Sequence, residues 1–206
     1  MQLCKGKSYI EAVTNISPQQ ITRFANYYLE QVKEYTGGKH KLFIDKNPTN
    51  FLHIALIKRL FPEAKIIALL RDPLDNAISV YKQNFSRGND FSFQMNHIIE
   101  YSSGYLALLQ HWQNEFANQI HHLKYHTLVT EPEQSIRSLL KYCELDFQAQ
   151  CLEFYTSKRP ILTPSVSQVR QPITTKALGS GNDYLAFLPD IKDALNSQRV
   201  QIASLE

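Results

Sequence analysis

The chain has 206 residues, 43% of them hydrophobic, and a formal net charge of +3. This length suits one domain with a sizeable core, and the composition is that of a globular protein rather than a disordered one. The mild charge and the lack of an apolar run approaching the about 18 residues of a membrane span argue against a nucleic-acid-binding or membrane protein, but they allow a local pocket for a small anion.

The first strong helix signal begins at a capping box, in which Gln20 follows three residues after Ser17. Apolar residues then recur at helical spacing until Gly37, which predicts an amphipathic helix of about five turns. The sequence KLFID (41–45) predicts a short strand. A second helix should follow over residues 48–61.

The apolar run KIIALL (65–70) lacks polar alternation, so it predicts a strand buried on both faces, as in parallel sheets. A helix should restart at once at Asp72, before a proline. Further along, we expect a long helix over residues 90–118, a strand over 120–129 and a final helix from about residue 189. This alternation is typical of an α/β fold with a parallel sheet.

Two other stretches lie between the last predicted strand and the final helix. Thr130 and Glu133 have the spacing of a second capping box, which predicts a helix over SIRSLLKYC (135–143). Residues 157–183 are rich in proline and hydroxyl residues. An irregular stretch of this length in a compact domain favours a functional loop.

Arg71 directly follows the buried run, and Ser79 lies two turns inside the next helix. Ligands of open parallel sheets bind beyond the carboxyl ends of the strands, and a helix that begins there favours an anion. A guanidinium offers phosphate a bidentate fork, and a hydroxyl adds a further bond. From these residues alone, an alternative stays open in which Arg71 pairs with Asp75 and Ser79 merely packs.

Three blocks of the sequence resemble the sulfotransferase superfamily, and they occur in the family's order. They are DKNPTNFLHIALIKRLFPEAKIIALLRDPLDNAISVYKQNF (45–85), LKYHTLVTEPEQSIRSLLKYCELDF (123–147) and TPSVSQVRQPITTKALGSGNDY (163–184). The likeness covers roughly residues 7–190. It looks closest to the bacterial branch associated with tetratricopeptide repeats, which is related to tyrosylprotein sulfotransferases.

The resemblance implies a P-loop-like three-layer sandwich, with a parallel sheet flanked by helices, as a single domain over residues 1–206. It also implies transfer of a sulfonate from 3′-phosphoadenosine 5′-phosphosulfate (PAPS) to a hydroxyl acceptor. By this likeness, Arg71 and Ser79 hold the 3′-phosphate of the donor, and Lys46 neutralises charge at the transferring sulfonate. A metal is not required where lysine and arginine supply the positive charge.

Three further residues match nucleotide contacts of the family. Tyr125 matches a tyrosine that lines the adenine site, and Ser165 and Arg170 match the loop that closes over the nucleotide. The acceptor is left open between a peptide, a carbohydrate and a small molecule. No nucleic-acid partner and no membrane partner are expected.

The family's domain begins with a strand, a Gly-Ser/Thr-rich turn of the type PxSGTT whose amides cradle the 5′-phosphosulfate, and a helix. The sequence contains no such turn, so we expect the first strand and helix to be missing, together with the usual carboxylate base. An incomplete sheet would expose an edge that favours self-association. The alternative to an active enzyme is therefore an inactive remnant that binds adenosine 3′,5′-bisphosphate or serves as an interaction module.

The expected compartment is the cytoplasm. The first residues, MQLCKGKSYIE, do not form a secretory signal. The three cysteines are an odd number without a CxxC pair, which favours a reducing environment over a disulfide framework.

Overall fold

The computed structural model describes residues 8–38, 42–83, 85, 88–157 and 168–205. The chain forms two compact units, Met1–Ala64 and Lys65–Glu206. The described residues are mostly helical and include a small parallel sheet, so the predicted α/β class is confirmed. None of their helices combines the length and the apolar character that crossing a membrane requires.

The first unit begins with two helices, α1 (Tyr9–Thr14) and α2 (Pro18–Thr36), each of which starts at a capping box. At α2, Gln20 N donates to Ser17 Oγ at 3.2 Å, and Ser17 N donates to Gln20 Oε1 at 2.9 Å. The helix ends at Gly37, whose φ of 68° lies in the left-handed region that favours glycine. The helix predicted from the capping box and the glycine is therefore confirmed.

The strand predicted over residues 41–45 is wrong, because residues 42–46 have no regular secondary structure. A strand needs a neighbour for its backbone hydrogen bonds, and the described residues of this unit contain no other strand. Side chains order the segment instead. Tyr28 Oη donates to Asp45 Oδ2 at 2.6 Å, and Asn50 Nδ2 donates to Asp45 Oδ1 at 3.3 Å.

The second predicted helix is shorter than its pattern suggested. It consists of a 3₁₀ turn, η1 (Asn50–His53), followed by α3 (Ile54–Leu60). Before it, the side chain of Asn47 accepts hydrogen bonds from the backbone N–H and the hydroxyl of Thr49, at 3.1 and 3.0 Å. This local Asn turn competes with a helical start, so the helix begins several residues later.

The sheet of the second unit consists of two parallel strands, β1 (Ile66–Leu70) and β2 (Ile120–Lys124). Ile66 lies opposite Ile120 at one end, and Leu70 lies opposite Lys124 at the other. The strand predicted over 120–129 is too long, because β1 offers no ladder partner beyond Leu70. The chain turns instead into α6 (Tyr125–Thr130).

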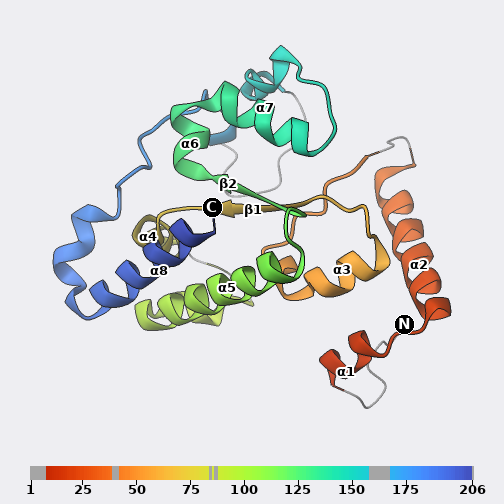
Figure 1. Cartoon of the computed structure of the whole chain (residues 1–206). Helices are drawn as coiled ribbons and strands as arrows, with labels where there is room; N and C mark the ends of the chain where they lie inside the picture. The colour runs from red at the N-terminus through yellow and green to blue at the C-terminus, as the bar shows by residue number, and fades with distance from the viewer. Residues whose placement is uncertain (1–7, 39–41, 84, 86–87, 158–167, 206) are drawn as a thin grey trace. The chain divides into compact units, whose positions relative to one another are not determined.

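One face of this sheet packs against α5 (Met95–Glu115) and α8 (Lys192–Ser204), and α4 (Pro73–Lys82) joins these helices (Figure 1). The buried cluster under the strands consists of Ala68, Leu70, Leu106, Leu109, Ile120 and Leu205. A second cluster lies among the three helices and consists of Leu74, Ala77, Ile78, Ile98, Ile99, Ile191 and Leu195. Together the two clusters fix α4 and α8 beside the end of β1.

Helices α6 and α7 (Pro132–Tyr142) lie on the other side of the strands (Figure 1). The ring of Tyr142 stacks on that of His121, with 5.1 Å between centroids. The Tyr142 hydroxyl donates to Gln119 O at 2.6 Å and accepts from Ile66 N at 3.1 Å. This one side chain thus joins the starts of both strands.

The capping box predicted for α7 does not form. Its N-cap residue is Glu131, without a side-chain cap, and the Glu133 carboxylate pairs with Arg137 one turn later. Short 3₁₀ helices complete the second unit: η2 (Asp90–Phe93), η3 (Ala149–Cys151), η4 (Phe154–Thr156), η5 (Gln168–Arg170), η6 (Asn182–Phe187) and η7 (Pro189–Ile191). The long helix predicted over 90–118 is thus divided into η2 and α5.

Candidate anion-binding site

Arg71 and Tyr125 are the first residues after the two parallel strands. Because Leu70 and Lys124 lie opposite each other, the next residue of each strand reaches the same edge of the sheet. The guanidinium carbon of Arg71 lies 5.0 Å from the centroid of the Tyr125 ring, within the range of a cation–π contact. Arg71 therefore lies at the carboxyl end of β1, as the sequence indicated, but the prediction that this strand is buried on both faces is wrong, because Ile67 and Leu69 are 45% and 53% exposed.

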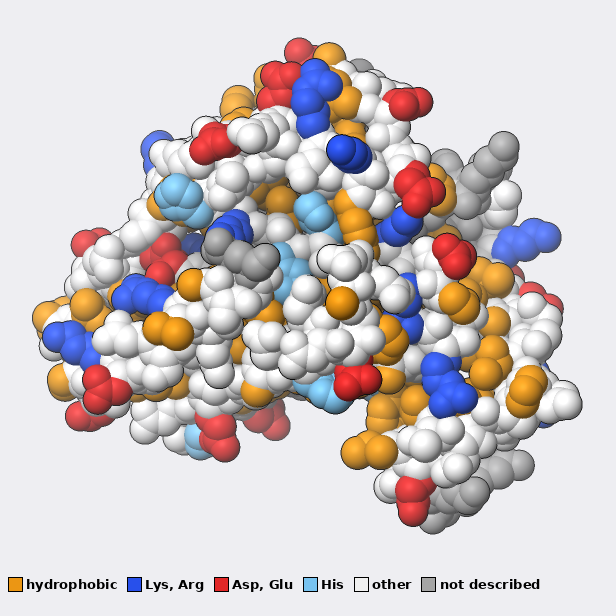
Figure 2. All heavy atoms as spheres, in the orientation of Figure 1, with side chains coloured by type: hydrophobic (Ala, Val, Ile, Leu, Met, Phe, Trp, Pro, Cys, Tyr) orange, Lys and Arg blue, Asp and Glu red, His pale blue; other side chains and the backbone are white. Residues whose placement is uncertain are grey.

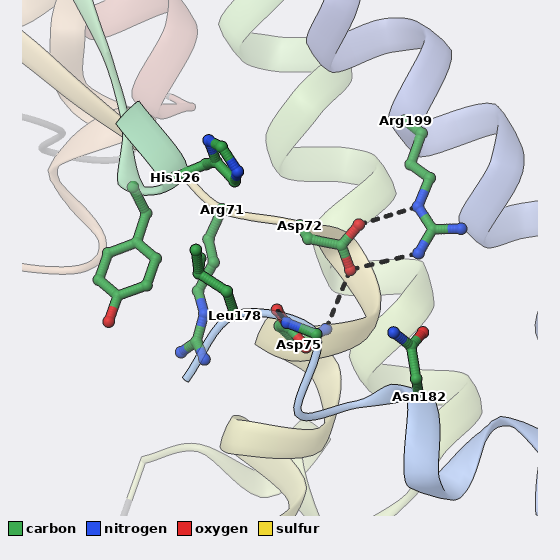
Figure 3. A pocket seen from close by; sticks show the side chains of 9 residues that line it. Arg71, Asp72, Asp75, His126, Leu178, Asn182 and Arg199 are labelled. Carbon is green, nitrogen blue, oxygen red and sulfur yellow. Dashed lines mark hydrogen bonds and ion pairs between the residues drawn. The ribbon is translucent and has the colours of Figure 1, made fainter. Parts of the chain in front are cut away.

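A cavity of about 210 Å³ opens beside this pair (Figure 3). Its walls come from the start of α4, from α6, from the chain around η6 and from α8. The lining residues are Arg71, Asp72, Asp75, Tyr125, His126, Leu178, Gly179, Asn182 and Arg199.

Asp72 caps α4 with its own carboxylate. Its Oδ1 accepts hydrogen bonds from the backbone N–H groups of Leu74 and Asp75, at 3.0 and 3.2 Å. The amides at the start of α4 are thus already satisfied by an internal anion. A ligand anion in this cavity therefore depends on the side chain of Arg71 rather than on the end of the helix.

Arg199 of α8 forms a forked ion pair with the same carboxylate. Its Nε donates to Asp72 Oδ2 at 2.9 Å, and its Nη2 donates to Asp72 Oδ1 at 3.3 Å (Figure 3). Partial burial acts to raise the pKa of Asp72, but the hydrogen bonds from Arg199 and from the backbone outweigh it and lower that pKa below its ordinary value. The pair therefore stays ionised at neutral pH.

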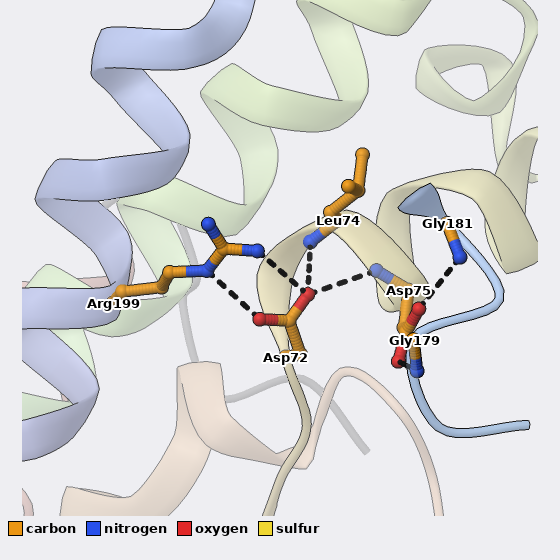
Figure 4. A network of polar contacts seen from close by, with 6 residues as sticks. All are labelled: Asp72, Leu74, Asp75, Gly179, Gly181 and Arg199. Atoms are coloured by element: carbon orange, nitrogen blue, oxygen red, sulfur yellow. Dashed lines mark hydrogen bonds and ion pairs between the residues drawn. The ribbon is translucent and has the colours of Figure 1, made fainter. Parts of the chain in front are cut away.

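Asp75 fastens the chain before η6 to α4. Its side chain is only 3% exposed, and its two oxygens accept from the backbone N–H groups of Gly179 and Gly181, at 2.8 and 2.7 Å (Figure 4). Both positions need glycine, because Gly179 has a φ of +71° and a Cβ on Gly181 would lie 2.7 Å from Leu74 Cγ. A buried carboxylate thus fixes one wall of the cavity.

The guanidinium of Arg71 is only partly satisfied by the chain. Its Nη2 donates to Ala177 O at 3.3 Å, while its Nε is buried and has no hydrogen-bond partner among the described residues. No ion pair joins Arg71 to Asp75, although the structure describes both residues, so the alternative pairing left open by the sequence is wrong. A buried guanidinium donor without a hydrogen-bond partner is costly.

Neither of the two other predicted site residues that the structure describes in the second unit lines this cavity. Ser79 is exposed on α4 and does not line the cavity, and Arg170 is exposed in η5. Lys46 is exposed in the first unit, and Ser165 lies outside the described residues. Of the predicted site residues that the structure describes in the second unit, Arg71 and Tyr125 are therefore the two that line the cavity.

No sequence pattern predicted a site role for Asp72 or for Arg199. The Asp-Pro start of α4 is a sequence signal for the cap, but nothing near Asp72 in the sequence indicates a partner 127 residues away. Asp75 was considered only as a partner of Arg71, and its true partners follow 104 and 106 residues later.

The charges of the described residues suit a small, local anion site. On the face that Figure 2 shows, Lys and Arg side chains are interspersed with Asp and Glu side chains rather than gathered in one patch. Among the described residues, no group of three His, Cys, Asp or Glu side chains is arranged to hold a metal ion. The arginines and carboxylates that line the cavity are Arg71, Arg199, Asp72 and Asp75.

The model of a family described as "Sulfotransferase family" matches residues 4–149 of the chain. The chain belongs to the sulfotransferase family. This confirms the superfamily that the three sequence blocks resembled.

A curated relative from Aquifex aeolicus (strain VF5), which carries the name "Uncharacterized protein", is 35% identical over 192 residues. The match covers 92% of this chain and 25% of the relative, so the chain spans about a quarter of that protein's length. The solved sulfotransferase domain from the curacin biosynthetic pathway is similar in structure, with a TM-score of 0.63 and 16% identity. That match covers 87% of this chain and 67% of the domain, and it supports the sulfotransferase fold.

Proposed function

We propose that the chain binds PAPS at the cavity beside Arg71 and takes part in transfer of its sulfonate to a hydroxyl acceptor. The observation that carries the proposal is the Arg71 guanidinium, which has a buried, unpartnered Nε and lies against the Tyr125 ring at the carboxyl end of the sheet. Membership of the sulfotransferase family supports the class of reaction.

The donor fits the chemistry of these two side chains. The 3′-phosphate of PAPS is an anion with several acceptor oxygens, and Arg71, which lines the cavity, offers such a group a charged planar guanidinium. Tyr125 presents an aromatic face beside it, where a nucleotide base or sugar packs well. Ordinary adenine nucleotides lack the 3′-phosphate, so we assign to Arg71 the discrimination between AMP and adenosine 3′,5′-bisphosphate.

The remaining predicted residues complete the proposal. Ser79 adds a hydroxyl to the 3′-phosphate, and Ser165 and Arg170 belong to the loop that closes over the nucleotide. In the transfer, a bond forms between the sulfur and the acceptor oxygen while the sulfur–oxygen bond to the donor phosphate breaks. Adenosine 3′,5′-bisphosphate leaves, and the proton of the acceptor hydroxyl passes to solvent water. Lys46 stabilises the negative charge that develops on the donor side, a task that fixed positive charge performs well.

A comparison of two ligands tests the proposed donor. Adenosine 3′,5′-bisphosphate should raise the melting temperature of the chain more than AMP does at equal concentration, because Arg71 reads the additional phosphate. Arg71→Ala should weaken binding of the bisphosphate by about tenfold or more, since a hydrogen bond to a charged group contributes about 1.5–3 kcal/mol. Arg137→Ala removes an exposed guanidinium outside the cavity and should leave the preference unchanged. Equal shifts for the two nucleotides would contradict the proposal.

Transfer itself needs a separate assay. The chain is incubated with PAPS and a panel of acceptors that includes a tyrosine peptide, a carbohydrate and a small alcohol, and the sulfonated product is measured. Formation of a sulfonated product supports the proposal that the chain is an active sulfotransferase. Binding of the bisphosphate without product from any acceptor supports the alternative, a nucleotide-binding module without catalytic activity.

A further inference from the structure

Two cations and two carboxylates line the cavity, and they are not equivalent. Asp75 is buried, and both of its oxygens accept from backbone N–H groups. Asp72 is 39% exposed, and its second oxygen meets only the guanidinium of Arg199. Asp72 directly follows Arg71 in the sequence, and Arg71 is the residue proposed to bind the anion.

Arg199 lies on the opposite side of Asp72 from Arg71 (Figure 3). Both of its hydrogen bonds go to Asp72, so its guanidinium lies beside that carboxylate in the cavity lining. Half-exposed ion pairs contribute little to folding stability, and the side chains of this pair are 42% and 39% exposed. The main effect of this ion pair is on the cavity, where the positive charge of Arg199 offsets the negative charge of Asp72.

We propose that Arg199 is a positioning and charge-compensating residue of the anion site, which holds and masks the Asp72 carboxylate so that a phosphate group can bind at Arg71. This inference rests on the proposed function in taking a phosphate as the ligand of the cavity. Without Arg199, the lining holds one cation and two carboxylates, and the exposed one repels an incoming phosphate. Arg199 lies beyond residues 4–149, where the family model matches, so this residue adds to what the family indicates.

The chain offers a set of variants that separates charge masking from direct contact. Arg199→Gln removes the compensating charge, and Asp72→Asn removes the carboxylate while keeping a good helix cap. The double variant removes both members of the pair. Arg199→Lys keeps the charge but loses the planar fork. Arg137→Gln is the matched control, because Arg137 forms an exposed pair with Glu133 and does not line the cavity.

Binding of adenosine 3′,5′-bisphosphate, AMP and inorganic phosphate is measured by calorimetry at two salt concentrations. Arg199→Gln should weaken binding of the bisphosphate and of inorganic phosphate by about tenfold at low salt, as expected for an uncompensated charge a few ångströms away. The loss should shrink at about 1 M salt, where charges at this distance are strongly screened. The double variant and Arg199→Lys should recover most of the affinity, and Arg137→Gln should bind like the original chain.

Two results would overturn the inference. One is unchanged affinity in Arg199→Gln. The other is a double variant that binds as weakly as Arg199→Gln, which would mean that Arg199 contacts the ligand itself. If Arg199→Gln does not fold, weak binding by a folded Arg199→Lys or double variant overturns the inference equally.

The experiment also separates this inference from the proposed function. If the original chain binds the bisphosphate no better than AMP while phosphate binding still depends on Arg199, the proposed donor is wrong and the charge compensation stands. If the original chain binds none of the three probes, both are overturned.

Discussion

Two stretches of the chain have the same order of residues but different structures. KLFIDKNP (41–48) and KIIALLRDP (65–73) each contain an apolar run, a cation and a proline that favours a helix. Only the second forms a strand followed at once by a helix, because β2 supplies its ladder and Asp72 caps the new helix. Residues 42–46 remain irregular, and the next polar side chain, Asn47, bonds Thr49 in a local turn.

The comparison shows that an apolar run followed by a cation does not by itself build a site. Arg71 is held by the Ala177 carbonyl and by the Tyr125 ring, so its guanidinium is preorganised. Lys46 is exposed in a segment without secondary structure. Preorganisation lowers the entropy lost on binding, so we expect Arg71 to govern ligand affinity and Lys46 to matter mainly in the transfer step.

The largest expected difference lies between Asp45 of the first stretch and Asp75, which follows two residues after the second stretch in α4. Asp75→Ala leaves two backbone N–H groups without their acceptor, one of them in a buried contact, and should lower the free energy of unfolding by about 3 kcal/mol. Asp45→Ala removes exposed bonds to Tyr28 and Asn50 and should cost about 1 kcal/mol or less. Urea unfolding of both variants measures the difference. Similar losses would contradict the claim that only the second stretch is tightly anchored.

The next largest effect on stability is expected where the segment that contains Gly179 and Gly181 packs against α4. Gly181→Ala would bring a Cβ to 2.7 Å from Leu74 Cγ and 3.0 Å from Leu74 C, so it should lower the free energy of unfolding by about 2 kcal/mol. Gly104→Ala, inside α5 with nothing within 4 Å, should instead raise it by about 0.5–1 kcal/mol. Thermal unfolding of the two variants should therefore move in opposite directions. A neutral Gly181→Ala would show that the close approach is not maintained.

The dependence of stability on pH tests the contribution of the Asp72 carboxylate, which caps α4. Because its pKa is lower in the folded chain than its usual value, the stability that it contributes is complete above about pH 5, and it is lost as pH falls through about 4 and then through the native pKa. The wild-type chain should be about 1 kcal/mol more stable than Asp72→Asn at pH 7, and this advantage should fade toward pH 3. Urea unfolding across pH measures it. An advantage that grows as the pH falls would contradict the assigned direction.

The smallest effect on stability is expected at Lys46. Lys46→Ala alters an exposed side chain and should change the free energy of unfolding by about 0.5 kcal/mol or less. If Lys46 acts on the transferring sulfonate, the same variant should lower product formation by about tenfold or more in the acceptor assay. Full product formation with Lys46→Ala would remove its proposed role.

Sequence patterns predicted the parts of the fold that local chemistry determines. The Ser17–Gln20 box, the glycine after α2 and the uniform apolar run of β1 each identify an element without reference to the rest of the chain. The predictions that failed concern segments whose structure depends on a partner elsewhere in the chain. The strand predicted over 41–45 lacks a neighbour, and the Thr130–Glu133 box loses Glu133 to Arg137.

The same distinction holds for the candidate site. Arg71 was identifiable from its place after an apolar run, and the parallel register then brings Tyr125 to it. The partners of Asp72 and Asp75 come from residues more than 100 positions later. Only the packing of α4 against α8 and of the glycines against α4 brings them together, and no local pattern encodes that packing.

The contact between Arg71 and a 3′-phosphate is tested most directly by phosphorus NMR. Adenosine 3′,5′-bisphosphate has two distinguishable phosphorus resonances, so a titration with the chain reports which phosphate is bound. The same titration with Arg71→Ala reports whether Arg71 binds it. We expect the 3′ resonance to shift on binding to the wild-type chain, and this shift to disappear with Arg71→Ala. A response confined to the 5′ resonance, or a 3′ shift that persists in Arg71→Ala, would contradict the account.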